Sequence, residues 1–167
     1  LNIFNKIIKF YPINKNYFNF IDNNNIRNDN KIVFIGKMND NRQYIKDVLK
    51  ERLIIIEEMW TKEEWTDLMN KYLFFINVHR RKNCDCFEIL RVYPLLYNGC
   101  VVFSEYVNKQ EMEIYSKFNV IFYEKDKLLE VLNNYKVDYD NIQKKKNEFR
   151  NRTNNDINTF SNIIKNL

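Results

Sequence analysis

The chain has 167 residues, of which 45% are hydrophobic and 16% aromatic, and its 27 basic and 22 acidic residues give a net charge of +5. This length fits one domain of ordinary size with a core of its own. The positive surplus is small and dispersed, so it suits an anionic small ligand or an acidic membrane surface and argues against nucleic acid as a partner. The sequence holds no apolar run near the ~18 residues that a transmembrane helix needs, and no signal peptide is visible.

The number and spacing of the cysteines indicate the cellular compartment of the protein. There are three of them, and Cys84 and Cys86 are too close together for a disulfide framework, so we expect the reducing cytoplasm rather than secretion. The abundance of Asn, Lys and Ile is typical of an AT-rich genome, microbial or viral; for a virus the compartment becomes the host cytoplasm or the virion. Because the chain begins with Leu1 and not with Met, we expect it to be a piece of a longer protein.

Residues 1–30 form the first segment. They are polar and rich in Asn, with an aromatic cluster at Phe10-Tyr11 and no clean period. We expect a short helix near Ile3–Phe10 and then a long connection that ends at Asn28-Asp29-Asn30. We interpret this segment as an N-terminal extension or the remnant of an interdomain connection, and residues 31–167 as the domain itself.

From Lys31 onward, short apolar strands alternate with amphipathic helices. Thr61 is expected to cap one of these helices, with Glu64 closing a capping box. The predicted strands cover 32–35, 53–56, 73–79, 100–103 and 120–123, and the predicted helices cover 41–52, 61–72, 87–97, 110–117, 126–135 and 139 to about 167. This alternation predicts an α/β domain with a parallel sheet of about five strands, helices on both faces and a long C-terminal helix.

Right-handed crossovers place the carboxyl ends of all the strands at one edge of such a sheet. The residues that follow the strands should therefore gather there: Gly36, Glu57-Glu58, His79, Ser104-Glu105 and Glu124. The chain has only two glycines, Gly36 and Gly99, and both fall at strand–helix junctions. We expect each to occupy a tight turn or to lie beside a ligand, because such junctions are where α/β sheets bind ligands.

Several common nucleotide and hydrolase motifs are excluded. The first strand is followed by Gly36-Lys37-Met38-Asn39-Asp40, which lacks the Gly-rich turn of a dinucleotide fold and the Gly-Lys-Ser/Thr of a P-loop. It also lacks the acidic cluster of a phospho-receiver, whose third strand would end in Asp and not in Val78-His79. No serine lies between glycines, which excludes a lipase-type nucleophile elbow.

The stretch from Phe75 to Glu105 resembles the donor-binding half of GT-B glycosyltransferases, closest to the glycosyltransferase family 1 and CgeB-like group. The motifs that carry this resemblance are Ile76-Asn77-Val78-His79, Phe87-Glu88-Ile89-Leu90-Arg91, and Asn98-Gly99-Cys100-Val101-Val102 followed by Ser104-Glu105. The Ile32–Gly36 strand with Asn41-Arg42 is similar to the first loop of that domain, so the resemblance covers most of residues 31–135. It implies the C-terminal, Rossmann-like half of a GT-B enzyme.

The resemblance implies transfer of a sugar from a nucleotide-sugar, such as a UDP- or GDP-sugar, to a glycan, protein or lipid, together with an N-terminal acceptor domain. Glu88 would accept hydrogen bonds from the ribose hydroxyls, and Arg91 would hold Glu88 or reach a phosphate. Lys37 and Arg42 would flank a diphosphate. The other residues placed at the donor are Gly36, His79, Phe87, Ser104 and Glu105. The resemblance implies neither metal nor cofactor, since cations and backbone dipoles meet the leaving-group charge, and it assigns no catalytic residue.

The sequence also departs from that family. Retaining members carry a second glutamate at a fixed spacing, and Leu96 stands at the corresponding position after Glu88. Pro94 falls inside a predicted helix, where it should kink the helix or mark its first turn, and the Gly-rich loop is reduced to Gly36. A non-catalytic Rossmann-like module that binds a partner protein or a sugar is therefore the alternative.

Each candidate residue has a purely structural explanation beside the functional one. Glu88 and Arg91 can be an ion pair on a surface helix, His79 a buried structural histidine, and Glu105 a cap for the next segment. Zinc binding by His79, Cys84 and Cys86 lacks a fourth ligand, so no metal site is predicted. The basic runs 80–82 and 144–146 are expected to be solvated.

Overall fold

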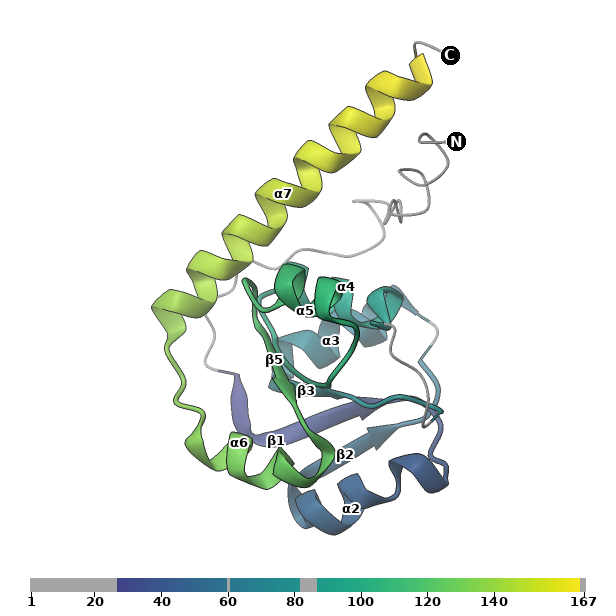
Figure 1. Ribbon diagram of the computed structural model, residues 1–167, viewed down its shortest axis with the longest axis vertical. Coiled ribbons are helices and arrows are strands. Elements are labelled where there is room, and N and C mark those ends of the chain that lie inside the picture. The colour runs from purple at the N-terminus through teal and green to yellow at the C-terminus, as the bar shows by residue number, and fades with distance from the viewer. Residues whose placement is uncertain (1–26, 60, 82–86, 166–167) are drawn as a thin grey trace.

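The computed structural model describes residues 27–59, 61–81 and 87–165, with side chains as far as Asp156 (Figure 1). The helix expected near Ile3–Phe10 lies outside these residues. The strands are β1 (Asn28–Ile35), β2 (Leu53–Ile56), β3 (Tyr72–Asn77), β4 (Val101–Glu105) and β5 (Val120–Tyr123). The helices are α2 (Tyr44–Leu49), α3 (Lys62–Lys71), α4 (Ile89–Tyr97), α5 (Lys109–Tyr115), α6 (Leu128–Asn134) and α7 (Tyr139–Lys165).

The strands form one parallel sheet in the order β2-β1-β3-β4-β5. The predicted α/β fold with a long C-terminal helix is thus confirmed. Along the chain the sheet first grows from β1 to β2 and then crosses back to β3 on the other side of β1. In a sheet of this kind the loops after β1 and β3 leave toward opposite faces, so a crevice forms between their carboxyl ends.

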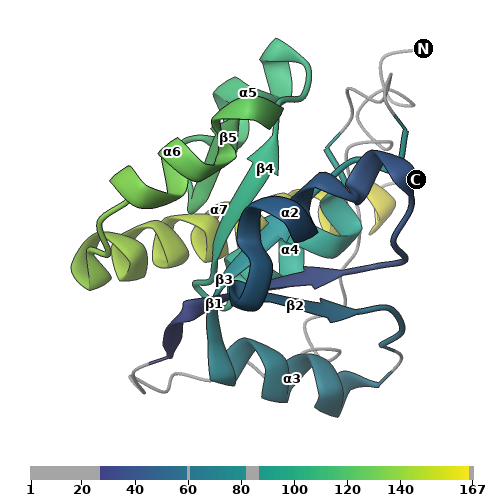
Figure 2. The ribbon, with the colours of Figure 1, turned by 90° about the horizontal axis from the view of Figure 1, so that it is seen from below.

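Helices flank the sheet on its two faces (Figure 2), and each helical layer packs on the sheet through one apolar cluster. On one face α3, α4 and α5 pack through residues such as Met69, Leu95 and Met112. On the other face α2 and α6 pack through Ile45 and Leu128. The central strands β3 and β4 and the second half of β1 are buried because helices cover them on both sides, whereas the edge strand β2 is only partly buried. This cover explains the nearly continuous apolar sequence of the strands.

Helix α7 lies along the amino edge of the sheet, opposite to the ends where ligands are expected. Ile142 accepts a hydrogen bond from Asn119 just before β5 at 3.1 Å, and Arg150 donates to the Tyr97 carbonyl before β4 at 2.8 Å. Within the described part of the chain, no helix combines the length and the apolar character that a membrane crossing requires.

The capping box predicted for α3 is confirmed. The Thr61 amide donates to the Glu64 carboxylate at 2.8 Å, and the Glu64 amide donates to the Thr61 hydroxyl at 3.2 Å. Gly99 has φ of +71°, and a Cβ there would lie 2.8 Å from Lys146 Cδ, so the predicted tight turn is also confirmed. The expectation that 144–146 is solvated is wrong for Lys146, whose side chain is buried against this turn.

The helix predicted over 41–52 is the largest difference from the sequence-based expectation. It is divided into a 3-10 turn, η1 (Asp40–Arg42), the short helix α2 and a second 3-10 turn, η2 (Lys50–Arg52). Asn39 caps η1 through its side chain, which accepts from the Arg42 amide at 3.2 Å. The tight turn directs Arg42 inward, where carbonyl groups of other segments bind its guanidinium, and these tertiary contacts override the local helical pattern.

Candidate ligand site at the carboxyl edge of the sheet

The crevice between β1 and β3 is bordered by a buried arginine. Arg42 Nη1 donates to the Lys37 carbonyl at 2.8 Å, and its Nε and Nη2 donate to the Val78 carbonyl at 3.1 and 2.9 Å. The guanidinium also lies over the Phe34 ring, 5.0 Å from its centroid. Arg42 therefore joins the loop after β1 to the end of β3, and it is one of the residues that the sequence placed at the donor.

Glu88 lies between two arginines at the start of α4. Its carboxylate is 2.6 Å from Arg91 Nη2 and 3.5 Å from Arg42 Nη2, so the predicted Glu88–Arg91 contact is confirmed. Burial lowers the pKa of both guanidinium groups, and the charge of Glu88 opposes this decrease. The Glu88 side chain keeps 22% exposure, although its Oε2 is buried against Arg91, so the two arginines fix the orientation of a carboxylate that is only partly accessible at the crevice.

A hydrogen-bond chain runs from this cluster across β3 to β4. Arg91 Nη1 donates to Asn77 Oδ1 at 3.3 Å, Asn77 Nδ2 donates to Ser104 Oγ at 3.1 Å, and the Ser104 hydroxyl donates to the Glu105 carbonyl at 3.0 Å. Ser104 is fully buried. It therefore orients Asn77 through a buried hydrogen bond and is not placed to contact a ligand directly.

Three other sequence-predicted residues have distinct surroundings. Gly36 has its amide bonded to the Ile56 carbonyl at 2.8 Å, and a Cβ there would lie 3.5 Å from the guanidinium nitrogens of both Arg42 and Arg91. Lys37 is exposed and pairs with Glu58 at 3.4 Å. Phe87 is a core residue, stacked on Tyr115 with the ring centroids 4.3 Å apart, which places it beside the cluster and not in it.

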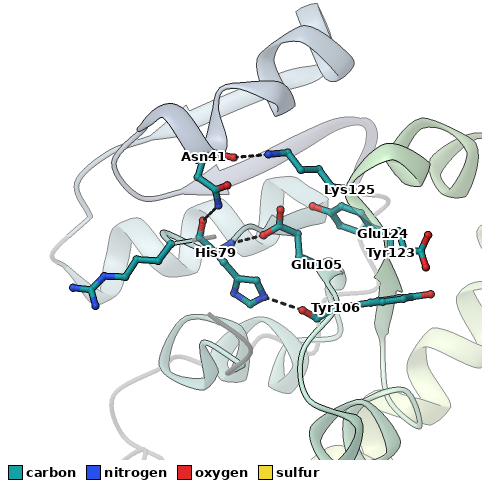
Figure 3. Close-up of a pocket in the computed structure, with 8 residues that line it drawn as sticks. Asn41, His79, Glu105, Tyr106, Tyr123, Glu124 and Lys125 are labelled. Carbon is teal, nitrogen blue, oxygen red and sulfur yellow. Dashed lines mark hydrogen bonds between the residues drawn. The ribbon is translucent and has the colours of Figure 1, made fainter. Parts of the chain in front are cut away.

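A pocket of about 400 Å³ opens next to this cluster, at the carboxyl ends of β3, β4 and β5 (Figure 3). The residues that line it are mixed in charge, and more of their lining surface is apolar than polar: Asn41, His79, Arg81, Glu105, Tyr106, Tyr123, Glu124 and Lys125. Two predicted site residues, His79 and Glu105, are thus brought together here, 26 positions apart in the chain and joined by a hydrogen bond from the His79 amide to Glu105 Oε2 at 2.7 Å.

Two linked tyrosines, the half-buried Tyr44 and the buried Tyr123, lie on the other side of Glu105. The Tyr44 hydroxyl donates to Glu105 Oε1 at 2.8 Å. Since this donation uses the only proton of Tyr44, the Tyr123 hydroxyl, 2.9 Å away, donates to Tyr44 in turn. Burial is the main cause that raises the pKa of both phenols, and the negative charge of Glu105 raises it further. Both tyrosines therefore remain protonated donors at neutral pH.

The crevice and the pocket are neighbouring parts of one edge. Asn41 Nδ2 donates to the His79 carbonyl at 2.9 Å, next to the Val78 carbonyl that Arg42 binds. The sequence did not predict Asn41, Tyr44, Asn77, Tyr106, Tyr123 and Lys125 as site residues. Only Asn77 carried a signal, because a lone amide inside the apolar run of β3 must find buried partners.

Comparison of the sequence with protein-family models and with curated proteins gave no match. Among the described residues, no group of three or more His, Cys, Asp and Glu side chains is placed to hold a metal ion. The sequence contains one Asp-x-Asp triplet, Asp138-Tyr139-Asp140, and it begins α7 at the amino edge of the sheet, away from the crevice.

Proposed function

We propose that this domain binds the nucleotide part of a nucleotide-sugar in the crevice between β1 and β3 and acts as the donor-binding half of a GT-B glycosyltransferase. The observation that carries the proposal is the partly exposed Glu88 side chain, whose carboxylate is held by Arg42 and Arg91 at the switch point of a parallel sheet. A carboxylate is an acceptor that suits the hydroxyls of a ribose, and a ligand that used both oxygens would have to reach Oε2 beside Arg91. Ligands of α/β sheets bind at such switch points.

The charges around Glu88 suit the diphosphate of the same ligand. Arg91 lies at the crevice with its guanidinium already oriented by Glu88 and by Asn77. Lys37 has an exposed side chain at the end of β1, and a long flexible cation of this kind reaches a phosphate without rearrangement of the backbone. In a transfer reaction these cations would stabilise the charge that develops on the departing nucleoside diphosphate.

A binding panel tests the proposal. The melting temperature of the full chain is measured with uridine, guanosine, adenosine and cytidine diphosphates and with their sugar conjugates. A ligand that binds only the native state stabilises that state by about 2.7 kcal/mol at a hundredfold excess over Kd. We expect one base to raise the melting temperature. Glu88→Gln should reduce that shift, and the matched control Glu51→Gln, an exposed glutamate of η2 at the amino edge, should not.

A non-catalytic module is the second candidate, and one observation favours it. Glu88 is already neutralised by two arginines, and the Gly36 amide is occupied by Ile56, so the crevice is satisfied without a ligand. If the domain is such a non-catalytic module, no nucleotide of the panel shifts the melting temperature of the folded chain. A folded Glu88→Gln variant that binds nucleotide as tightly as the wild type would remove Glu88 from the proposed role.

A further inference from the structure

The pocket beside the crevice has a chemistry different from that of the Glu88 cluster. We infer that it binds an uncharged sugar ring through the hydroxyl groups of that ring. The inference deepens the proposed function and rests on it for one point, the source of the sugar, which would be the glycosyl group of the bound nucleotide-sugar. The volume of about 400 Å³ lies within the range of small-molecule sites.

The charges that line the pocket cancel. Arg81 and Lys125 contribute two positive charges, and Glu105 and Glu124 contribute two negative charges. The Lys125 ammonium lies 4.4 Å from the Tyr44 ring centroid and donates to the Asn41 carbonyl at 3.3 Å. A phosphate would meet a carboxylate in this pocket, whereas a hydroxyl group both donates and accepts and so suits a mixed lining.

Glu105 is an acceptor of fixed orientation in this lining. Glu105 is 8% exposed. Each of its two carboxylate oxygens accepts one hydrogen bond, Oε1 from the Tyr44 hydroxyl and Oε2 from the His79 amide. A carboxylate has about four acceptor positions, so it retains capacity for ligand hydroxyls. Because the donors fix its rotamer, a ligand does not have to order it, which reduces the entropic cost of binding.

His79 supplies an unsatisfied acceptor at the same wall. Its ring is 5% exposed, and Nε2 lies 3.1 Å from the Tyr106 carbonyl, which requires the proton on Nε2. Nδ1 is then an acceptor, and among the described residues it has no hydrogen-bond partner. A buried acceptor without a partner costs free energy. A hydroxyl group that reached Nδ1 and donated to it would remove that cost while the Nε2 bond to Tyr106 is kept.

Tyr106 gives the pocket an aromatic side. Its side chain is 47% exposed, and Figure 3 shows the ring extended along the pocket below Glu124. The backbone is fixed, since the Tyr106 amide donates to the Tyr123 carbonyl at 3.2 Å. An exposed aromatic face beside polar groups suits the C–H face of a pyranose ring, whose hydroxyls then point toward Glu105 and His79.

Amide NMR spectra of the full chain distinguish the sources of the sugar. The probes are UDP, GDP, UDP-glucose, GDP-mannose and the methyl glycosides of glucose and mannose. We expect at least one sugar-containing probe to shift the amide signals of His79, Tyr106 and Glu124, and the sugar-free diphosphates to shift only signals around Glu88. A response to a methyl glycoside without any response to nucleotides supports the pocket and contradicts the proposed nucleotide function.

Variants complete the test. Tyr106→Ala and Glu124→Gln, both at exposed positions, should weaken a responding sugar-containing probe about tenfold and change binding of the diphosphate less than about twofold. Tyr139→Ala, at a comparably exposed tyrosine of α7, is the control and should change neither. The inference is overturned if no sugar-containing probe shifts the pocket signals, or if the nucleotide-sugar binds as tightly to Tyr106→Ala and Glu124→Gln as to the wild type.

Discussion

The guanidinium of Arg42 lies 3.5 Å from the carboxylate of Glu88, although Arg42 follows β1 and Glu88 precedes α4. The same guanidinium donates to the carbonyl groups of Lys37 and Val78. One side chain therefore joins both loops that border the switch point of the sheet and orients the carboxylate between them. The geometry of the candidate site depends on Arg42 even though Arg42 is almost inaccessible to a ligand.

Replacement of Arg42 should destabilise the domain. Arg42→Ala leaves the buried Val78 carbonyl and the part-buried Lys37 carbonyl without this donor. An unsatisfied buried group costs roughly 1–3 kcal/mol, so we expect the free energy of unfolding to fall by about 2–4 kcal/mol. Arg42→Lys should recover only part of the loss, because an ammonium cannot bind Lys37 and Val78 in the same fork. Urea unfolding monitored by circular dichroism measures both variants.

The matched control is Arg152→Ala on α7. Arg152 is half-exposed, 4.0 Å from Asp156 and 5.7 Å from the centroid of the Phe118 ring, so the change in unfolding free energy should stay within about 1 kcal/mol. If Arg42→Ala were as stable as the control variant, the role of Arg42 as the link between the loops would be wrong.

The turn before β4 offers a second stability test. Gly99→Ala places a Cβ 2.8 Å from Lys146 Cδ in a residue with φ of +71°, so we expect a loss of about 2–3 kcal/mol from steric overlap and left-handed backbone strain together. In the double variant Gly99→Ala/Lys146→Ala the overlap disappears and only the strain remains. A double-mutant cycle by urea unfolding should therefore show coupling, and strictly additive losses would contradict the contact.

The fold was predictable from the sequence because its strands are apolar runs of the length that a covered parallel sheet needs. The alternation also predicted which edge would collect the polar residues. It did not predict the division of 41–52, because Arg42 turns inward to carbonyl groups of β3, a segment far along the chain. It also did not predict the burial of Lys146, since the contact with Gly99 joins α7 to the turn before β4.

The site was predictable only in part. Glu88 and Arg91 are three residues apart on one helix, so their contact follows from local geometry. The contacts of Glu105 with Tyr44 and His79 depend on the strand order, which alternation alone does not give. Ser104 was predicted at the edge because it follows a predicted strand, and the family resemblance implied contact with the donor. Side chains alternate along a strand, however, and this one lies on the face that α4 covers, where it accepts from Asn77.

Alkaline pH should destabilise the domain through the buried tyrosines. Burial raises the pKa of Tyr44 and Tyr123 above the usual value near 10, so above that value the unfolded chain loses protons that the folded chain retains. The contribution of these phenols to the free energy of unfolding is fully present below pH ~10. It decreases as the pH rises toward the raised pKa of the folded state, by up to about 1.4 kcal/mol per pH unit for each phenol.

Urea unfolding between about pH 8 and about pH 11 measures this slope. Tyr123→Phe removes one of the titrating groups and leaves the Tyr44–Glu105 hydrogen bond in place, so its slope should be shallower than that of the wild type. Ultraviolet absorbance of tyrosinate provides an independent reading of the same titration. A slope unchanged by Tyr123→Phe would show that Tyr123 is not buried as described.

Cys100 should resist alkylation in the native state. It is fully buried at the start of β4, and burial raises the pKa of its thiol to about 11 from 9.0. The thiolate is the reactive form, so at neutral pH this shift alone lowers its population about a hundredfold, and access to the reagent is restricted as well. Treatment with iodoacetamide followed by mass spectrometry of the peptide that contains Cys100 separates it from Cys84 and Cys86. We expect modification to be slow in buffer and rapid in denaturant, and equal rates in the two conditions would contradict the packing of β4 between the two helical layers.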